Sequence, residues 1–152
     1  MRDIKFRAWH KLHGEMREVY GITFNNEQKI TSLLINGFQP GERSEFFWYQ
    51  AMDETDKYDM SMKFEDLFVL MQYTGCRDKN GVDIYEGDYL SLIIFEANTE
   101  FKGEVVFSEG SFCVAIQIKG HDYKVPLHET TEEDSLVEVL GNIYENPELL
   151  ED

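Results

Sequence analysis

Residues 71–95 read MQYTGCRDKNGVDIYEGDYLSLIIF and carry the strongest fold signal in the chain. Asn80 and Gly81 readily adopt the positive φ angles of a type I′ turn, and apolar segments flank them, so a β-hairpin is expected here. Residues 89–95 are apolar on both faces of an alternating pattern, which is typical of a strand inside a sheet. The stretch therefore predicts a β-protein.

Further short apolar segments follow at even spacing towards the C-terminus. About five short strands with tight turns over roughly seventy residues suit a small SH3-like barrel. Asn146 and Pro147 predict the start of a terminal helical turn. The strands are expected at 104–107, 112–118, 123–127 and 137–144, with turns at 108–110 and 119–122.

The N-terminal half predicts a meander followed by a variable segment. Alternating apolar residues indicate strands at 1–9, 16–24 and 30–38. Pro40, Gly41 and the mostly charged residues 52–59 predict a mobile loop over 39–60. A short helix is expected near 61–70, although Leu67 to Tyr73 also suits a buried strand.

The predicted fold class is therefore mainly β, with minor α. The chain is expected to be a single domain over 1–152. Its subdivisions would be a β-meander over 1–70 and an SH3-like barrel over 71–152.

Composition excludes several broad classes. The 152 residues are 42% hydrophobic, enough to form a core, and carry a net charge of −16. This field repels polyanions, so direct binding to nucleic acid or to anionic membranes is not expected. The sequence shows neither a secretion signal nor an apolar run of the roughly 18 residues that a spanning helix needs. We therefore expect a cytoplasmic protein.

Three blocks of sequence resemble the YopX family. They are RDIKFRAW at 2–9, MQYTG at 71–75 with DKNG at 78–81 and IYEGD at 84–88, and GNIYENPELL at 141–150. The resemblance implies a phage or prophage protein of a bacterial host, built of several coiled β-sheets that include an SH3-like barrel. It implies no established activity.

Two residues depart from the family pattern. Cys76 stands where a leucine usually follows Thr-Gly, which favours a small packed side chain and argues against a nucleophile. Cys113 shares a strand face with Ala115 and is also expected in the core. His10 stands where an acidic residue often follows Ala-Trp, which weakens the idea of an obligatory acid there.

No pattern of catalytic, cofactor-binding or metal-binding residues is strong. Val82 occupies the position where an EF-hand loop needs its third ligand, so the acidic run around it is interpreted as turns. His10 and His13 lack further zinc ligands, and a solvated turn is the preferred interpretation. His121 and His128 could approach one another across a strand, but no other ligand is evident. The oxygen donors of the acidic run are Asp78, Asn80, Asp83, Glu86 and Asp88.

The sequence contains no Gly-x-Ser-x-Gly pattern of a nucleophile elbow. No Lys-Ser or Lys-Thr follows the recurring glycines at 75, 81 and 87, which are interpreted as turn residues and not as a phosphate-binding loop. We therefore expect no enzyme, no cofactor and no metal.

Aromatic and charged segments suggest contacts with other chains. Four adjacent aromatic side chains cannot all point inward from one strand, so Phe46, Phe47, Trp48 and Tyr49 are candidate partner contacts. Residues 129–152 contain nine carboxylates and no Lys or Arg. One interpretation is that they dock against basic residues near the N-terminus, within a subunit or between subunits of a homo-oligomer; the alternative is that both are ordinary solvated faces. The basic residues are Arg2, Lys5, Arg7, Lys11 and Arg17.

Two functions remain open. The first is a non-enzymatic phage accessory protein that binds a host or phage protein. The alternative is an acidic DNA mimic that inhibits a host nuclease or DNA-binding protein. A mimic needs carboxylates spaced like phosphates along one face, whereas a protein-binding module needs an apolar patch with a polar rim.

Overall fold

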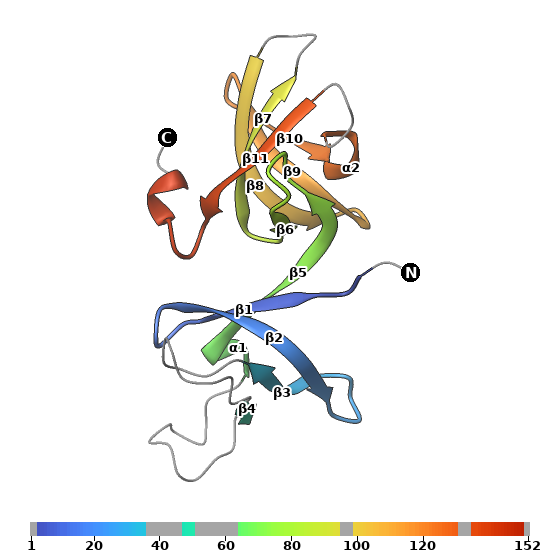
Figure 1. Cartoon of the computed structure of the whole chain (residues 1–152), viewed down its shortest axis with the longest axis vertical. Coiled ribbons are helices and arrows are strands. Elements are labelled where there is room, and N and C mark those ends of the chain that lie inside the picture. The colour runs from blue at the N-terminus through green and yellow to red at the C-terminus, as the bar shows by residue number, and fades with distance from the viewer. Residues whose placement is uncertain (1–2, 36–46, 51–63, 95–98, 131–134, 151–152) are drawn as a thin grey trace. The chain divides into compact units, whose positions relative to one another are not determined.

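A computed structural model describes residues 3–35, 47–50, 64–94, 99–130 and 135–150. The described chain is mainly β, with two antiparallel sheets, which confirms the predicted fold class at this level (Figure 1). It divides into two compact units: an N-terminal unit, Lys5–Leu70, and a C-terminal unit, Met71–Asp152 together with Met1–Ile4.

The N-terminal unit contains the predicted meander. Its strands are β1 (Phe6–His10), β2 (Glu15–Phe24), β3 (Ile30–Ile35) and β4 (Phe47–Gln50), in the spatial order β4-β3-β2-β1. A four-residue helix, α1 (Phe64–Leu67), and the first residues of β5 (Phe68–Arg77) complete the unit. Its core is formed by the buried side chains of Ala8, Leu33, Ile35, Leu67 and Phe68.

The segment around 61–73 combines both predicted forms. Helix α1 ends at Leu67, and the chain continues directly as strand β5. Met71 and Tyr73 are both buried, two residues apart, and this period of two favours a strand. Of the loop predicted at 39–60, the structure describes only 47–50, which form β4.

The C-terminal unit is built around a five-stranded sheet. The remainder of β5 pairs with β6, where Tyr73 lies opposite Tyr85. The five strands lie in the order β10-β9-β8-β7-β11 and form a curved sheet (Figure 1). The elements are β6 (Asp83–Tyr85), β7 (Asp88–Ile94), β8 (Thr99–Ser108), β9 (Ser111–Ile118), β10 (His121–Pro126), α2 (Leu127–Thr130), β11 (Ser135–Asn142) and the 3₁₀ turn η1 (Pro147–Leu150).

One face of this sheet, the inner face, forms the core of the unit. Leu90 lies opposite Gly103, and Gly103 lies opposite Ile116, so their neighbours at intervals of two share that face. We call the opposite side, which includes Tyr89, Glu104 and Ala115, the outer face. The buried core residues are Ile84, Leu90, Leu92, Val105, Val114, Ile116, Leu127 and Val137.

The closed SH3-like barrel expected from strand spacing stays a prediction. In the described residues, β10 and β11 stand at the two ends of the strand order and are not paired with each other.

The type I′ turn predicted at Asn80 and Gly81 is wrong. Only Gly81 has a positive φ, at 82°. The Asp78 side chain accepts hydrogen bonds from the N–H groups of Asn80 (2.8 Å) and Val82 (2.9 Å), and the Gly81 N–H donates to the Asp78 carbonyl (2.9 Å). These bonds stabilise a turn over 78–81 with a single left-handed residue.

Type I′ geometry occurs instead at two other hairpins. Glu109 and Gly110 have φ of 53° and 85°, and Lys119 and Gly120 have φ of 51° and 79°. Each pair forms a two-residue loop, which matches the right-handed twist of the flanking strands and fixes their register. Among the described residues, no helix has the length and apolar character needed to cross a membrane.

Candidate functional site

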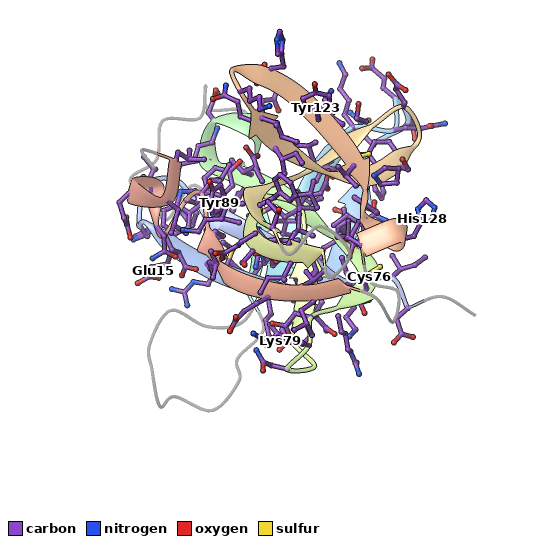
Figure 2. The ribbon with its side chains drawn as sticks, turned by 90° about the horizontal axis from the view of Figure 1, so that it is seen from above. Glu15, Cys76, Lys79, Tyr89, Tyr123 and His128 are labelled. Atoms are coloured by element: carbon purple, nitrogen blue, oxygen red, sulfur yellow. The ribbon has the colours of Figure 1, made fainter. Side chains whose placement is uncertain are left out.

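A pocket of about 450 Å³ opens on the C-terminal unit. Strand β5 supplies Thr74 and Cys76, the β8–β9 hairpin supplies Phe107 and Phe112, and helix α2 supplies Leu127 and His128. Cys76 and His128 lie on the same side of this unit in Figure 2, in agreement with their shared place in the lining. We call this hollow the aromatic pocket.

The aromatic pocket is dominated by one pair of rings. Phe107 and Phe112 are directly opposite each other in the β8–β9 register, and their ring centroids lie 5.2 Å apart at 67°. This edge-to-face geometry is a favoured arrangement of two aromatic rings. Phe112 packs against the core, whereas Phe107 is 58% exposed. The hairpin therefore holds a large apolar ring in solvent at a fixed position.

Polar groups at the margin of the pocket are largely bonded within the chain. The Thr74 hydroxyl donates to the Ile84 carbonyl at 2.9 Å. The Ser111 hydroxyl lies 3.4 Å from the Ser108 carbonyl and 3.5 Å from the Cys113 sulfur. Cys76 packs against the core, which confirms its predicted role as a small apolar side chain. The pocket thus combines aromatic and aliphatic walls with polar side chains such as Thr74 and Ser111.

A second cavity, of about 580 Å³, lies on the outer face of the five-stranded sheet. Strand β8 contributes Glu100, Lys102 and Glu104, and η1 contributes Leu150. The Glu100 carboxylate accepts a hydrogen bond from the Ser91 hydroxyl at 2.7 Å. Burial raises the pKa of Glu104. This cavity is lined by side chains of both charges, whereas the aromatic pocket has no Asp, Glu, Lys or Arg in its lining.

The predicted aromatic contacts fall only partly within the described chain. Phe46 lies outside the described residues. The backbone of Phe47, Trp48 and Tyr49 forms β4 and pairs with β3. Their role in binding a partner stays a prediction.

The two histidines near the N-terminus do come together, but the predicted solvated turn is wrong for His10. His10 is the last residue of β1 and is fully buried, on the same face as Ala8. Its ring lies 4.4 Å from that of His13 and 4.7 Å from that of Phe68. The His13 N–H donates to His10 Nδ1 at 3.4 Å. His10 is therefore buried within the N-terminal unit, whereas His13 is exposed in the turn that follows β1, as predicted.

Three acidic side chains in the run at 78–88, those of Asp78, Glu86 and Asp88, accept hydrogen bonds from backbone N–H groups. Burial of the Asp78 carboxyl opposes its ionisation, but bonds from the N–H groups of Val82, Val139 and Asn80 outweigh burial and lower the pKa of Asp78. Asp88, 1% exposed, accepts a bond from the Tyr85 N–H at 2.7 Å. In the described residues, no group of three or more His, Cys, Asp or Glu side chains is arranged to hold a metal ion.

Of the other predicted residues, His128 lines the aromatic pocket, whereas Cys113, His121 and the basic N-terminal residues do not. Cys113 is buried, as predicted, and both cysteines are free thiols. His121 begins β10 and His128 follows its end, so roughly 17 Å of strand separates them. Of the basic N-terminal residues, Lys11 donates to the Glu65 carbonyl at 2.6 Å, and Arg17 pairs with Glu15. The proposed docking of the basic and acidic ends stays a prediction.

Sequence reasoning missed Phe107 and Phe112. Both lie in predicted strands on either side of a predicted turn, so a two-residue loop at Glu109 and Gly110 already places them opposite each other. The pocket itself needed the tertiary structure, because β5 and α2 supply the other walls.

The fold and the pocket define a class of protein: a mainly β chain of two compact units, with the exposed Phe107 ring on the C-terminal unit. The chain belongs to the YopX family, because that family's model, described as YopX protein, matches residues 5–151. This confirms the resemblance recognised in the sequence.

Solved structures agree with this assignment. Protein EF1440 from Enterococcus faecalis is 28% identical, with a TM-score of 0.63 and 99% of each chain covered. YopX from Bacillus subtilis is 19% identical, with a TM-score of 0.56, and the match covers 97% of this chain and 96% of that one. The second likeness shows a shared fold. No curated protein gives a significant match to the chain.

Proposed function

We propose that the chain is a non-enzymatic protein-binding module, an accessory protein of a phage or prophage, whose contact surface is the aromatic pocket. The observation that carries the proposal is the 58% exposure of Phe107 while its ring rests on Phe112. Large aromatic rings at the centre of a patch with a polar rim are the usual anchors of protein interfaces.

The occupant is an apolar side chain on a polypeptide with a basic surface. A volume of about 450 Å³ with walls from Phe107, Phe112 and Leu127 suits such a side chain. The net charge of −16 favours encounter with a positively charged partner.

Two lysines that interrupt the described carboxylates, Lys79 and Lys102, favour this role over DNA mimicry. In the acidic C-terminal segment, Glu138 pairs with Lys79 at 2.6 Å, whereas Glu145 and Glu148 accept bonds from the neutral amides of Asn142 and Asn146 and keep their charge. On the outer face, Lys102 lies between Glu100 and Glu104 along β8. A mimic needs carboxylates spaced like phosphates along one face, and a lysine among them breaks that pattern of charge.

The experiment is an affinity capture from host lysate and from phage-infected lysate, read by mass spectrometry. The baits are the wild type, Phe107→Ala and the matched control Phe24→Ala. Phe24 is 60% exposed and lies on β2 of the N-terminal unit, so the same ring is removed from a different surface. Nuclease treatment and excess duplex DNA form two further arms.

We expect a specific protein that the wild type and Phe24→Ala retain and Phe107→Ala loses, with no effect of nuclease or DNA. A partner released by duplex DNA and indifferent to Phe107→Ala would overturn the proposal in favour of mimicry. Retention of the same partners by all three baits would also overturn it.

A further inference from the structure

The two edges of the five-stranded sheet differ in how their backbone groups are satisfied. On β11, the Val137 carbonyl accepts a bond from the Lys79 N–H at 2.9 Å, and the Val139 N–H donates to the Asp78 carboxylate at 3.2 Å. The turn over 78–81 therefore covers this edge. Strand β10, at the other end of the sheet, has no such cover among the described residues.

Hairpin geometry shows which groups of β10 face outward. The two-residue loop at Lys119 and Gly120 makes Ile118 and His121 a hydrogen-bonded pair. Because such pairs alternate along an antiparallel ladder, Tyr123 also bonds to β9, and the N–H and C=O groups of Asp122 and Lys124 point away from the sheet.

The outward edge is short and has defined limits. Pro126 lacks an N–H, and Gly120 belongs to the turn, so bonding across the edge is restricted to Asp122 and Lys124. Both side chains are exposed: Asp122 accepts a bond from Gln117 at 3.2 Å, and Lys124 donates to Ser108 at 3.0 Å.

We propose that β10 pairs antiparallel with β10 of a second copy of this chain, about a two-fold axis through Tyr123. In this register Asp122 of each chain lies opposite Lys124 of the other, and each pair exchanges two backbone hydrogen bonds. Opposite charges directly across an antiparallel ladder are stabilising, and like charges there are destabilising. The edge is thus complementary in charge to itself, and the pairing is isologous and closed.

Figure 2 shows Tyr123 on a different side of the C-terminal unit from Cys76 and His128. Asp122, Tyr123 and Lys124 are not among the residues that line the aromatic pocket, so the inference does not rest on the proposed function. The contact is small, so we expect a reversible dimer.

The first test is sedimentation velocity of the full chain from about 1 to 500 µM. Asp122→Lys sets two ammonium groups opposite each other in each pair, and Lys124→Asp sets two carboxylates there. The double variant D122K/K124D restores opposite charges. Lys119→Asp is the control for Lys124→Asp, with the same charge change on the same hairpin but outside the paired segment. Circular dichroism verifies that every variant is folded.

We expect a dimer for the wild type, Lys119→Asp and the double variant, and a dissociation constant at least about tenfold higher for each single variant. Three results overturn the proposal: a monomeric wild type at all concentrations, single variants with unchanged dissociation constants, or a double variant that stays monomeric.

A second test is independent of charge. Tyr123 would face its own copy as a non-hydrogen-bonded pair, with Cα atoms about 4.5 Å apart, within the range that a disulfide can bridge. Tyr123→Cys should therefore give a covalent dimer on mild oxidation, and Tyr123→Cys combined with Asp122→Lys should not. The wild type controls for Cys76 and Cys113. Failure of Tyr123→Cys to cross-link would contradict the pairing.

Discussion

Asp78 connects the turn over 78–81 to the edge strand β11. Its carboxylate accepts bonds from the backbone N–H groups of Asn80, Val82 and Val139, and the residue is 7% exposed. Removing the side chain leaves these donors without an acceptor in a partly buried place. The role is structural, although the sequence around it resembles a set of cation ligands.

We expect Asp78→Ala to lower the free energy of unfolding by about 3 kcal/mol, because an unmet buried donor costs roughly 1 to 3 kcal/mol. Urea denaturation followed by circular dichroism measures the loss, and amide exchange at Val82 and Val139 locates it. Lys79→Ala is the neighbouring control. Its pair with Glu138 is partly exposed and should contribute less than about 1 kcal/mol. Equal losses in the two variants would refute the assigned role.

His10 makes the stability of the N-terminal unit depend on pH. Burial, followed by the nearby charges of His13 and Arg17, lowers the pKa of His10 from 6.5 to about 4, while Glu15 acts in the opposite direction. The unfolded chain, with its ordinary pKa, therefore binds a proton before the folded chain does. The neutral His10 ring therefore makes its full contribution to the free energy of unfolding above about pH 6.5, and this contribution is lost as the pH falls towards 4.

We expect the free energy of unfolding to fall by up to about 3 kcal/mol more in the wild type than in His10→Phe between pH 6.5 and 4. Phenylalanine keeps a ring in the site and removes the titration. Tryptophan fluorescence in denaturant follows the unfolding of the N-terminal unit, because both tryptophans, Trp9 and Trp48, lie within it. If the free energy of unfolding changed equally with pH in the two proteins, His10 would not titrate in this way.

At the scale of elements, strands β8 and β9 approach unusually closely at Gly103. A Cβ atom built there would lie 2.1 Å from the Ala115 carbonyl oxygen, which is a backbone atom and cannot rotate away. The close approach lies in the centre of the sheet, next to the core residue Ile116. Glycine is therefore required here by space.

We expect Gly103→Ala to destabilise the C-terminal unit by about 3 kcal/mol, the upper part of the usual range for an overpacked site. Gly81→Ala is the control. Its Cβ would meet nothing within 4 Å, and its φ of 82° alone should cost about 1 kcal/mol. Thermal unfolding by calorimetry compares the two. A smaller loss in Gly103→Ala than in Gly81→Ala would contradict the steric argument.

Local patterns predicted the strands well because alternation and turn chemistry are local properties. The segments around Phe112 and Tyr123 are strands as expected, and a glycine ends each intervening loop. The burial of His10 was missed because a polar residue at the end of a strand resembles the start of a turn. Only its parity with Ala8 indicated that it faces the core.

Only part of the aromatic pocket could be predicted, because only part of it depends on local sequence. The cross-strand pair of Phe107 and Phe112 depends on one short loop. The walls formed by Cys76, Leu127 and His128 depend on the packing of β5 and α2 against that hairpin, which no local pattern encodes.

At the scale of the whole molecule, charge governs how partners arrive. The net charge of −16 produces a field that accelerates encounter with a basic partner and is screened by salt. We expect the association rate constant for the captured partner to fall at least about tenfold between roughly 50 and 500 mM salt, with a smaller change in dissociation. Stopped-flow mixing measures both rates. An association rate indifferent to salt would exclude the basic partner.

Binding affinity at the aromatic pocket tests the central claim most directly. Isothermal titration calorimetry of the captured partner against the wild type, Phe107→Ala and Phe24→Ala gives three dissociation constants. Removal of an anchoring aromatic ring typically costs about 2 kcal/mol or more, so Phe107→Ala should bind about 30-fold more weakly. Phe24→Ala should stay within about twofold of the wild type. Equal dissociation constants for all three proteins would contradict the assignment of the pocket as the contact surface.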